Sequence, residues 1–398
     1  MSDNSTASSK SKNSHKYEVL YVDNNEKLLQ LCENIKNADT LILDTEFIRE
    51  KTYRARLCLI QIATDGIVAC VDPIALNDIT PLMDIIYDEN KIKILHSARQ
   101  DYEIFYDLNN KLPQPLFDSQ LAASLLGYGE QIGYASLVNQ LLHVQLEKAH
   151  TRTDWSKRPL SQEQVHYASD DVYYLNKLYP LLKKQLIELD RESWLDEEFK
   201  ALCNPDLFIT HPQEAWKRVK GINRLRPRQL AAAKNIAQWR EEVAVKKDRP
   251  RRWILADDIL IATAQLLPKN INQLESIANI KKSVIDNSGK FILDCIKNAL
   301  DMSETDLPTL KKVKRLSSNQ ESIADILMAQ LRIIANEHNI SSANIANRKM
   351  IEKIISGETD LAIFKGWRNQ LAGKKIKDLL SGKYCLHISE DKVSLKEM

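Results

Sequence analysis

The stretch LILDTEF, residues 41–47, decides the fold prediction because two acids interrupt a run that is otherwise mostly apolar. Side chains of a β-strand alternate between its two faces, so Asp44 and Glu46 project from the same face. Two like charges side by side repel, and burying them is costly unless a cation compensates. Hard divalent ions such as Mg²⁺ or Mn²⁺ take oxygen ligands. The stretch therefore predicts a strand that carries a metal site; the alternative is an exposed strand with both acids in water.

The sequence around this stretch alternates between strand and helix patterns. Period-two alternation and short apolar runs predict strands, whereas apolar residues three and four apart predict helices. The predicted strands are 17–21, 40–47, 57–63, 67–72 and 92–95, and the predicted helices are 25–35, 80–87, 97–108, 119–126, 136–142 and 161–189. Ser97 and Asp118 are expected to cap the helices that follow them. The order predicts a mixed sheet early in the chain that later helices cover.

Two further acids stand where helices could bring them to the first pair. Asp101 ends the motif HSARQD, one turn inside a predicted helix that follows a short strand. Tyr167 and Asp171, in the motif HYASDD, are four residues apart and share a helix face, whereas Asp170 is turned by about 100°. Asp171 is therefore the expected site residue. Taken singly, each acid has a simpler reading, as a first-turn acid that favours the helix dipole or as a surface acid.

These motifs together resemble the ribonuclease D family, in the tyrosine subgroup of the DEDD exonuclease superfamily. The matching segments are DTEF, HSARQD and HYASDD, with the same order and context as in the family. Gln61 and the segments LPQPLFDSQ and RTDWSKRPL also match. The resemblance extends from about residue 17 to residue 385, and the three motifs are specific as a set.

The resemblance implies an RNase H-like catalytic fold in which four carboxylates bind two divalent metal ions, Mg²⁺ or Mn²⁺, at the terminal phosphodiester. The implied ligands are Asp44, Glu46, Asp101 and Asp171. One metal would activate a water for in-line attack, and the other would stabilise the departing 3′ oxygen. Tyr167 would orient the water, because a reference pKa of about 10 suits a positioning group better than a strong base at neutral pH. The reaction would release 5′-mononucleotides from the 3′ end.

Four other residues are candidates for substrate contact. Thr45 points away from the acids and could offer backbone contacts, and Phe47 could stack on a terminal base. Arg158 is a candidate phosphate contact in the loop before the last catalytic-domain helix, and Trp155 shapes that loop. The alternative is that Thr45 and Phe47 belong to the core and that Trp155 is structural, with Arg158 on the surface.

The net charge of +2 hides two halves of opposite sign. Up to Thr210 there are 22 Lys and Arg against 32 Asp and Glu, and from His211 there are 34 against 22. An acidic half followed by a basic half suggests that one handles cations and the other a polyanion. The alternative is a drift of surface charge between domains for solubility.

The basic half resembles the helical HRDC modules of the family, which hold the RNA body. Lys and Arg between Trp216 and Trp253 could contact phosphates, and exposed Trp could stack on bases. Core packing is expected for at least two of Trp216, Trp239 and Trp253. The resulting prediction is an α/β exonuclease domain followed by two all-α HRDC-like domains. Its ranges are a disordered tail at 1–16, an exonuclease domain at 17–208, a first HRDC module at 211–300, a second HRDC-like module at 315–385 and a charged tail at 386–398.

The cysteine pattern fits a reducing compartment best. No run approaches the roughly 20 apolar residues of a membrane span, and residues 1–16 lack the apolar centre of a signal peptide. The six cysteines are scattered, without a CxxC pair, so neither a zinc site nor a disulfide framework is expected. We expect a cytoplasmic protein that acts on RNA, chiefly precursor tRNA 3′ ends as the family implies. No obligate protein partner is implied, and a monomer is expected.

Two other functions stay open from the sequence. A 3′-to-5′ DNA exonuclease would use the same carboxylates, so these acids do not distinguish the two polymers. A contact to the 2′-hydroxyl is what distinguishes RNA from DNA. A non-catalytic RNA-binding protein could retain the exonuclease scaffold, although all four acids are present.

Overall fold

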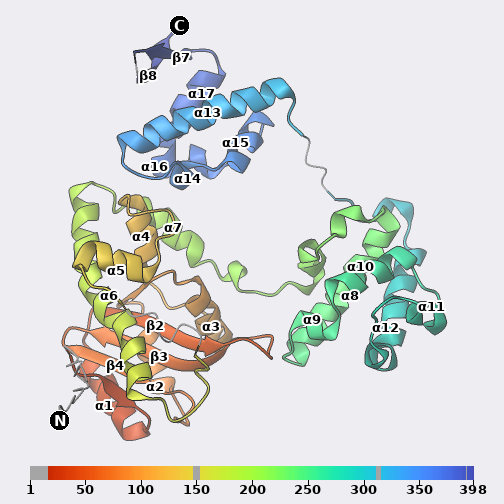
Figure 1. Cartoon of the computed structure of the whole chain (residues 1–398), viewed down its shortest axis with the longest axis horizontal. Helices are drawn as coiled ribbons and strands as arrows, with labels where there is room; N and C mark the ends of the chain where they lie inside the picture. Colours follow the sequence, from red (N-terminus) through yellow and green to blue (C-terminus); the bar gives the residue numbers. More distant parts are fainter. Residues whose placement is uncertain (1–16, 147–152, 311–314, 391) are drawn as a thin grey trace, which may run out of the picture.

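The computed structural model describes residues 17–146, 153–310, 315–390 and 392–398. An α/β domain is followed by two helical blocks (Figure 1). The tail expected at 1–16 lies outside the described residues. Among the described residues, no helix combines the length and apolar character needed to cross a bilayer.

The α/β domain contains a six-stranded mixed sheet in the order β1-β4-β3-β2-β5-β6. The pairs β2–β3 and β3–β4 are antiparallel, whereas β1–β4, β2–β5 and β5–β6 are parallel. The predicted mixed sheet is thus confirmed, and β6 is a short strand that the sequence patterns missed. The strands are β1 (Leu20–Val22), β2 (Thr40–Ile48), β3 (Arg56–Thr64), β4 (Ile67–Val71), β5 (Ile92–Leu95) and β6 (Leu116–Asp118).

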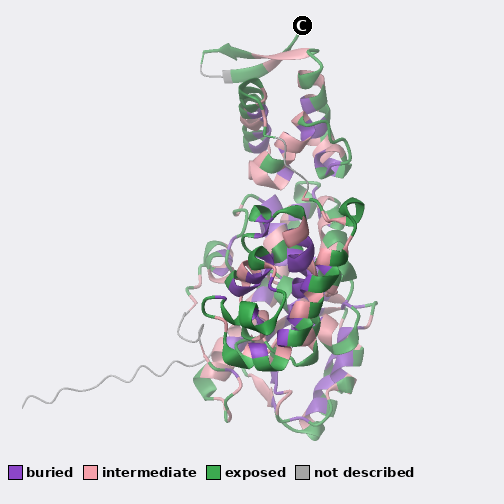
Figure 2. Ribbon diagram, turned by 90° about the vertical axis from the view of Figure 1, so that its right-hand side faces the viewer, coloured by how far each residue is buried: buried purple, intermediate pink, exposed green. Residues whose placement is uncertain are grey.

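Two apolar cores lie on the two faces of this sheet. Leu41 and Leu43 of β2 face a core that contains residues of α1, α2 and α3, and Ile42 faces a core that contains residues of α4 to α7. Asp44 and Glu46 share the face of Ile42, as the strand alternation requires. Figure 2 shows buried positions inside this body and exposed ones on the outer helix faces. The helices are α1 (Asn25–Ile35), α2 (Thr80–Ile86), α3 (Arg99–Asn109), α4 (Ser119–Leu125), α5 (Tyr134–Leu142), α6 (Gln162–Glu188) and α7 (Trp194–Leu202).

Asp118 connects the starts of two helices. Its carboxylate caps α4 by accepting hydrogen bonds from the backbone N–H groups of Gln120 and Leu121, as predicted. It also accepts bonds from the N–H groups of Ser97 and Ala98 at the start of α3, at 3.1 and 2.8 Å. The expected cap by Ser97 is wrong, because Ser97 has a φ of 61° and α3 begins after Ala98 without a side-chain cap. The distant carboxylate replaces the local hydroxyl.

The first helical block has its own apolar core. Trp216 is buried there, Trp239 packs against it, and Trp253 is 56% exposed, so core packing holds for two of the three, as expected. The helices are α8 (Pro227–Lys246), α9 (Arg251–Ile254), α10 (Asp257–Leu266), α11 (Ile271–Glu275) and α12 (Lys282–Asp301), with short turns at Pro205–Leu207, Pro212–Arg218, Ile222–Arg224 and Glu304–Asp306.

The second helical block packs on the α/β domain beside α4 and α7 (Figure 1). The rings of Trp194 and Trp367 stack at 4.4 Å, and Arg191 donates a 2.7 Å hydrogen bond to the carbonyl oxygen of His338. Two strands occupy most of the segment expected as a charged tail. The elements are α13 (Ser318–Glu337), α14 (Ser342–Ile345), α15 (Arg348–Ile355), α16 (Gly366–Arg368), α17 (Lys374–Leu380), β7 (Tyr384–Ser389) and β8 (Lys392–Glu397), with short turns at Ala362–Phe364 and Asn369–Gly373.

Candidate active site

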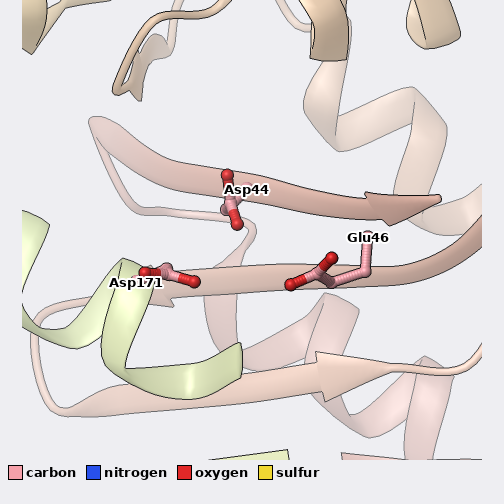
Figure 3. A group of neighbouring side chains, drawn as sticks. All are labelled: Asp44, Glu46 and Asp171. Carbon is pink, nitrogen blue, oxygen red and sulfur yellow. The ribbon is translucent and has the colours of Figure 1, made fainter. Parts of the chain in front are cut away.

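Three carboxylates meet above the middle of the sheet. Asp44 and Glu46 come from β2, and Asp171 extends toward them from α6 (Figure 3). One oxygen atom of each lies within 4.8 Å of the others, and all three side chains are half-buried. Strand alternation places the first two on one face, and α6 crosses that face so that Asp171 meets them. An all-oxygen cluster at this spacing suits a hard divalent cation.

Burial and mutual repulsion raise the pKa values of these carboxyl groups. Burial, followed by repulsion from Asp171 and Asp101, raises the pKa of Glu46 to about 8. Burial, followed by repulsion from Asp170 and Asp101, raises the pKa of Asp171 to about 7. The pKa of Asp44 also lies well above its ordinary value, for the same reasons. A positive charge at this place would stabilise the ionised form of the cluster.

Asp101 lies close enough for its charge to act on the cluster, but outside the group of three. It is buried in the first turn of α3, and burial raises its pKa to about 6. The hydroxyl of Thr45 donates a 2.5 Å hydrogen bond to Asp101 Oδ1. Thr45 was expected to point away from the acids, but its hydroxyl is hydrogen-bonded to the fourth acid. This bond holds Asp101 against β2 at Thr45, the residue between Asp44 and Glu46.

Tyr167 lies on α6 one turn before Asp171. Its ring stacks on Trp155 with centroids 6.3 Å apart and planes 26° apart. Trp155 is only 4% exposed, so it supports the ring of Tyr167 and has little surface to offer a base. Asp170 accepts a 2.6 Å hydrogen bond from the hydroxyl of Tyr17 and takes no part in the carboxylate cluster. The one-residue step along α6 separates Asp170 from Asp171.

Arg158, the expected phosphate contact, is hydrogen-bonded within the protein. Its guanidinium donates hydrogen bonds to both carboxylate oxygens of Asp72, at 2.5 and 2.7 Å. The remaining donors reach the carbonyl oxygens of Cys58, Trp155 and Lys157. All five N–H donors of an arginine are then in use. Arg158 fixes the loop that carries Trp155 against β3 and the end of β4.

Phe47 follows an irregularity in the β2–β3 pairing. The register shifts between Glu46 and Phe47, so that Glu46 lies opposite Leu59 and Phe47 lies opposite Leu57. Such a bulge changes the direction of the side chains that follow it. Phe47 is half-buried next to the carboxylates, and base stacking by Phe47 stays a prediction.

Sequence reasoning missed Tyr134, which helps to hold α6 in place. Tyr134 starts α5, and its hydroxyl donates a 2.9 Å hydrogen bond to the carbonyl oxygen of Asp170. The ring of His96 packs edge-on against Tyr134, with centroids 5.4 Å apart. No local pattern marks Tyr134, because its partner lies on a helix 36 residues later.

Comparison with known proteins gives the class and then the family. Residues 19–187 match the family model described as 3′-5′ exonuclease, and residues 229–296 match the HRDC domain model. The mixed sheet and the carboxylates from β2 and α6 all lie within residues 19–187. This match and this site together define the chain as a 3′-5′ exonuclease.

Similarity over nearly the whole chain narrows the class further. Ribonuclease D of Bartonella henselae is 37% identical, with 92% of this chain and 90% of that protein covered. Ribonuclease D of Zymomonas mobilis is 36% identical, with coverages of 92% and 95%. The crystal structure of Escherichia coli RNase D, described as an exoribonuclease involved in structured RNA processing, is 28% identical with a TM-score of 0.81 and coverages of 92% and 98%. The chain belongs to the ribonuclease D family and is a 3′-5′ exoribonuclease.

Proposed function

We propose that the chain trims the 3′ ends of precursor tRNA and other small structured RNAs by hydrolysis that depends on two divalent cations, Mg²⁺ or Mn²⁺. The proposed ligands are Asp44, Glu46, Asp101 and Asp171. The observation that carries the proposal is the meeting of three carboxylates within 4.8 Å at a half-buried place. These residues fit such cations, because the donors are all oxygen and their mutual repulsion is relieved by positive charge.

The chain's own residues bind and orient the reacting groups. Two bound cations supply a water of lowered pKa and stabilisation of the departing 3′ oxygen. Asp44 and Glu46 of β2, Asp101 of α3 and Asp171 of α6 would hold the cations. The hydroxyl of Tyr167 orients the attacking water, and Trp155 fixes the ring of Tyr167 from behind. Products leave as 5′-mononucleotides.

Tyr167→Phe removes the proposed positioning hydroxyl and keeps the ring that stacks on Trp155. We expect kcat for RNA hydrolysis to fall about a hundredfold, at the lower end of the range for a positioned proton-handling group. Affinity for Mn²⁺ should stay at the wild-type level, because Tyr167 is not among the proposed ligands. Single-turnover kinetics and Mn²⁺ titration measure the two quantities. A variant with wild-type kcat would remove Tyr167 from the mechanism.

The first helical block contacts the loop that follows β2, the strand that carries Asp44 and Glu46, which supports an RNA path along this junction. Asp248 accepts hydrogen bonds of 3.0 Å from the N–H groups of Tyr53 and Arg54, in the loop between β2 and β3. Tyr53 also donates a hydrogen bond to Glu241 of α8. Arginines from both sides line the clefts at this junction, where a phosphate backbone would find cationic partners. They are Arg49, Arg54, Arg99, Arg218 and Arg252.

Trp253 is the proposed stacking residue of this block. It is 56% exposed, and the guanidinium of Arg249 lies 5.8 Å from its ring centre. We expect Trp253→Ala to weaken binding of a single-stranded RNA about tenfold at fixed salt, because stacking on one base contributes about 1–3 kcal/mol. Phe291→Ala is the matched control, since Phe291 is 58% exposed in the same block. Fluorescence anisotropy gives both affinities, and equal losses in the two variants would argue against a specific role for Trp253.

The second block is proposed as a divergent HRDC-like module. Each block has a 20-residue helix, α8 or α13, followed by a four-residue helix, α9 or α14. An extended residue then ends the short helix, Leu255 with φ −158° in the first block and Ala346 with φ −159° in the second. The next helix, α10 or α15, begins two residues later. This repeated backbone pattern supports a common origin.

A precursor tRNA with a short 3′ extension tests the proposed substrate. We expect shortening of 5′-labelled RNA in single-nucleotide steps that slow at the folded acceptor stem, with 5′-mononucleotides as products. Shortening from the 5′ end, or equal trimming of an unstructured RNA of the same length, would contradict the substrate proposal. A cytoplasmic location is also proposed, because all six cysteines are free thiols.

A further inference from the structure

Gln61 presents two unpaired polar atoms beside the carboxylate site. It lies on β3 directly opposite Asp44 of β2 in the antiparallel pairing. The side chain is 0% exposed, and among the described residues neither its amide nitrogen nor its amide oxygen has a hydrogen-bond partner. Burying an unpaired amide group costs about 1–3 kcal/mol. An apolar side chain of the same size would avoid that cost.

The sheet register directs Gln61 to the face of the catalytic carboxylates. Residues directly opposite each other in an antiparallel pair project from the same face, with Cβ atoms about 4.5–5.5 Å apart. On its other side Gln61 lies opposite Cys70 of β4, whose thiol contacts the carbonyl oxygen of Val165 at 3.6 Å. Val165 belongs to α6, so the row Cys70, Gln61 and Asp44 lies beneath that helix. Within this row, Asp44 is the carboxylate neighbour of Gln61.

We propose that Gln61 is a positioning residue for the metal site: when the carboxylates hold a cation, its amide N–H, unpaired among the described residues of the metal-free chain, donates to one oxygen of Asp44 and leaves the other free for the cation. The inference rests on the proposed function, because Asp44 must be a metal ligand for the orientation to matter. Partners of this kind typically change metal affinity about 10–100-fold when they are removed. Gln61 therefore acts through Asp44 and does not contact the RNA.

Gln61→Met tests this role, because methionine has a similar length and shape and no hydrogen-bonding amide. We expect the affinity for Mn²⁺, measured by electron paramagnetic resonance without RNA, to fall at least tenfold. The thermal midpoint of the metal-free chain should equal or exceed that of wild type, because two unpaired buried groups are removed. Gln330→Met is the control, since Gln330 is also buried with an unpaired amide oxygen, but on α13. It should leave Mn²⁺ affinity unchanged.

The outcomes separate this inference from the proposed function. Wild-type Mn²⁺ affinity in Gln61→Met, with a loss in Asp44→Asn, overturns the role of Gln61 and leaves the metal site intact. Wild-type affinity in Asp44→Asn as well overturns the proposed metal site itself. A lower thermal midpoint of the metal-free Gln61→Met chain, with unchanged Mn²⁺ affinity, would make Gln61 a structural residue only.

Discussion

Asp171→Asn is expected to slow mononucleotide release from RNA about a thousandfold or more, whereas Asp170→Asn should keep most of the wild-type rate. Asp171 is one of the three carboxylates that meet within 4.8 Å, and Asp170 is not. Loss of a ligand that holds the cations removes several kcal/mol of transition-state stabilisation, and each 1.36 kcal/mol is about a tenfold change in rate. The two substitutions are chemically identical and adjacent, so their difference reports position alone.

The control at position 170 is well matched. The side chain of Asp170 accepts a hydrogen bond from Tyr17, and the amide oxygen of asparagine can accept the same bond. Single-turnover digestion of end-labelled RNA measures the rates, and filter binding checks that both variants still hold RNA. Comparable losses in the two variants would show that the face of α6, and with it the proposed ligand set, has been assigned wrongly.

Mg²⁺ is expected to stabilise the folded chain more at pH 8 than at pH 6. Burial, followed by carboxylate repulsion, raises the folded-state pKa values of Glu46 to about 8 and of Asp171 to about 7. Ordinary carboxyl pKa values are about 4, so between about pH 4 and pH 8 the metal-free folded state holds more protons than the unfolded state. Its free energy of unfolding must then fall as pH rises through that window. A bound cation replaces the protons on these carboxyl groups. At pH 8 fewer protons compete with the cation, so its stabilising effect is larger than at pH 6.

Thermal unfolding at pH 6, 7 and 8, with either EDTA or Mg²⁺, measures this linkage. The increase in the midpoint on addition of Mg²⁺ should grow with pH, and titration calorimetry in two buffers should detect released protons. Asp171→Asn should show a smaller pH effect, because one of the repelling carboxylates is absent. A midpoint shift that is independent of pH would contradict the proposed protonation of the metal-free cluster.

The regular repeat of side-chain directions along strands and helices allowed much of the site to be predicted from the sequence. Asp44 and Glu46 could be placed on one face because a strand alternates with period two, and Asp171 could be chosen over Asp170 because a helix turns about 100° per residue. In the structure Asp44 and Glu46 lie in one cluster with Asp171, and Asp170 is not part of it. Such arguments work where the spacing of neighbours within one element decides the geometry.

Contacts between distant segments could not be predicted in this way. Arg158 looked available for phosphate, but its partner Asp72 lies 86 residues earlier. Thr45 was predicted to point away from the acids, yet its hydroxyl donates a hydrogen bond to Asp101, 56 residues later in the chain. Gln61 gained its importance only from a strand register that places it opposite Asp44. Each of these depends on tertiary packing, which no local pattern encodes.

The most direct test of the central claim is digestion of a 3′-extended tRNA and a matched single-stranded DNA by wild type and Asp171→Asn, each with Mg²⁺, Mn²⁺ or EDTA. The account predicts mononucleotide release from the RNA 3′ end by the wild type with a divalent cation, and almost none in EDTA or with the variant. Undiminished RNA hydrolysis in EDTA or by Asp171→Asn would contradict the carboxylate metal site, and preference for the DNA would contradict the assignment to RNA.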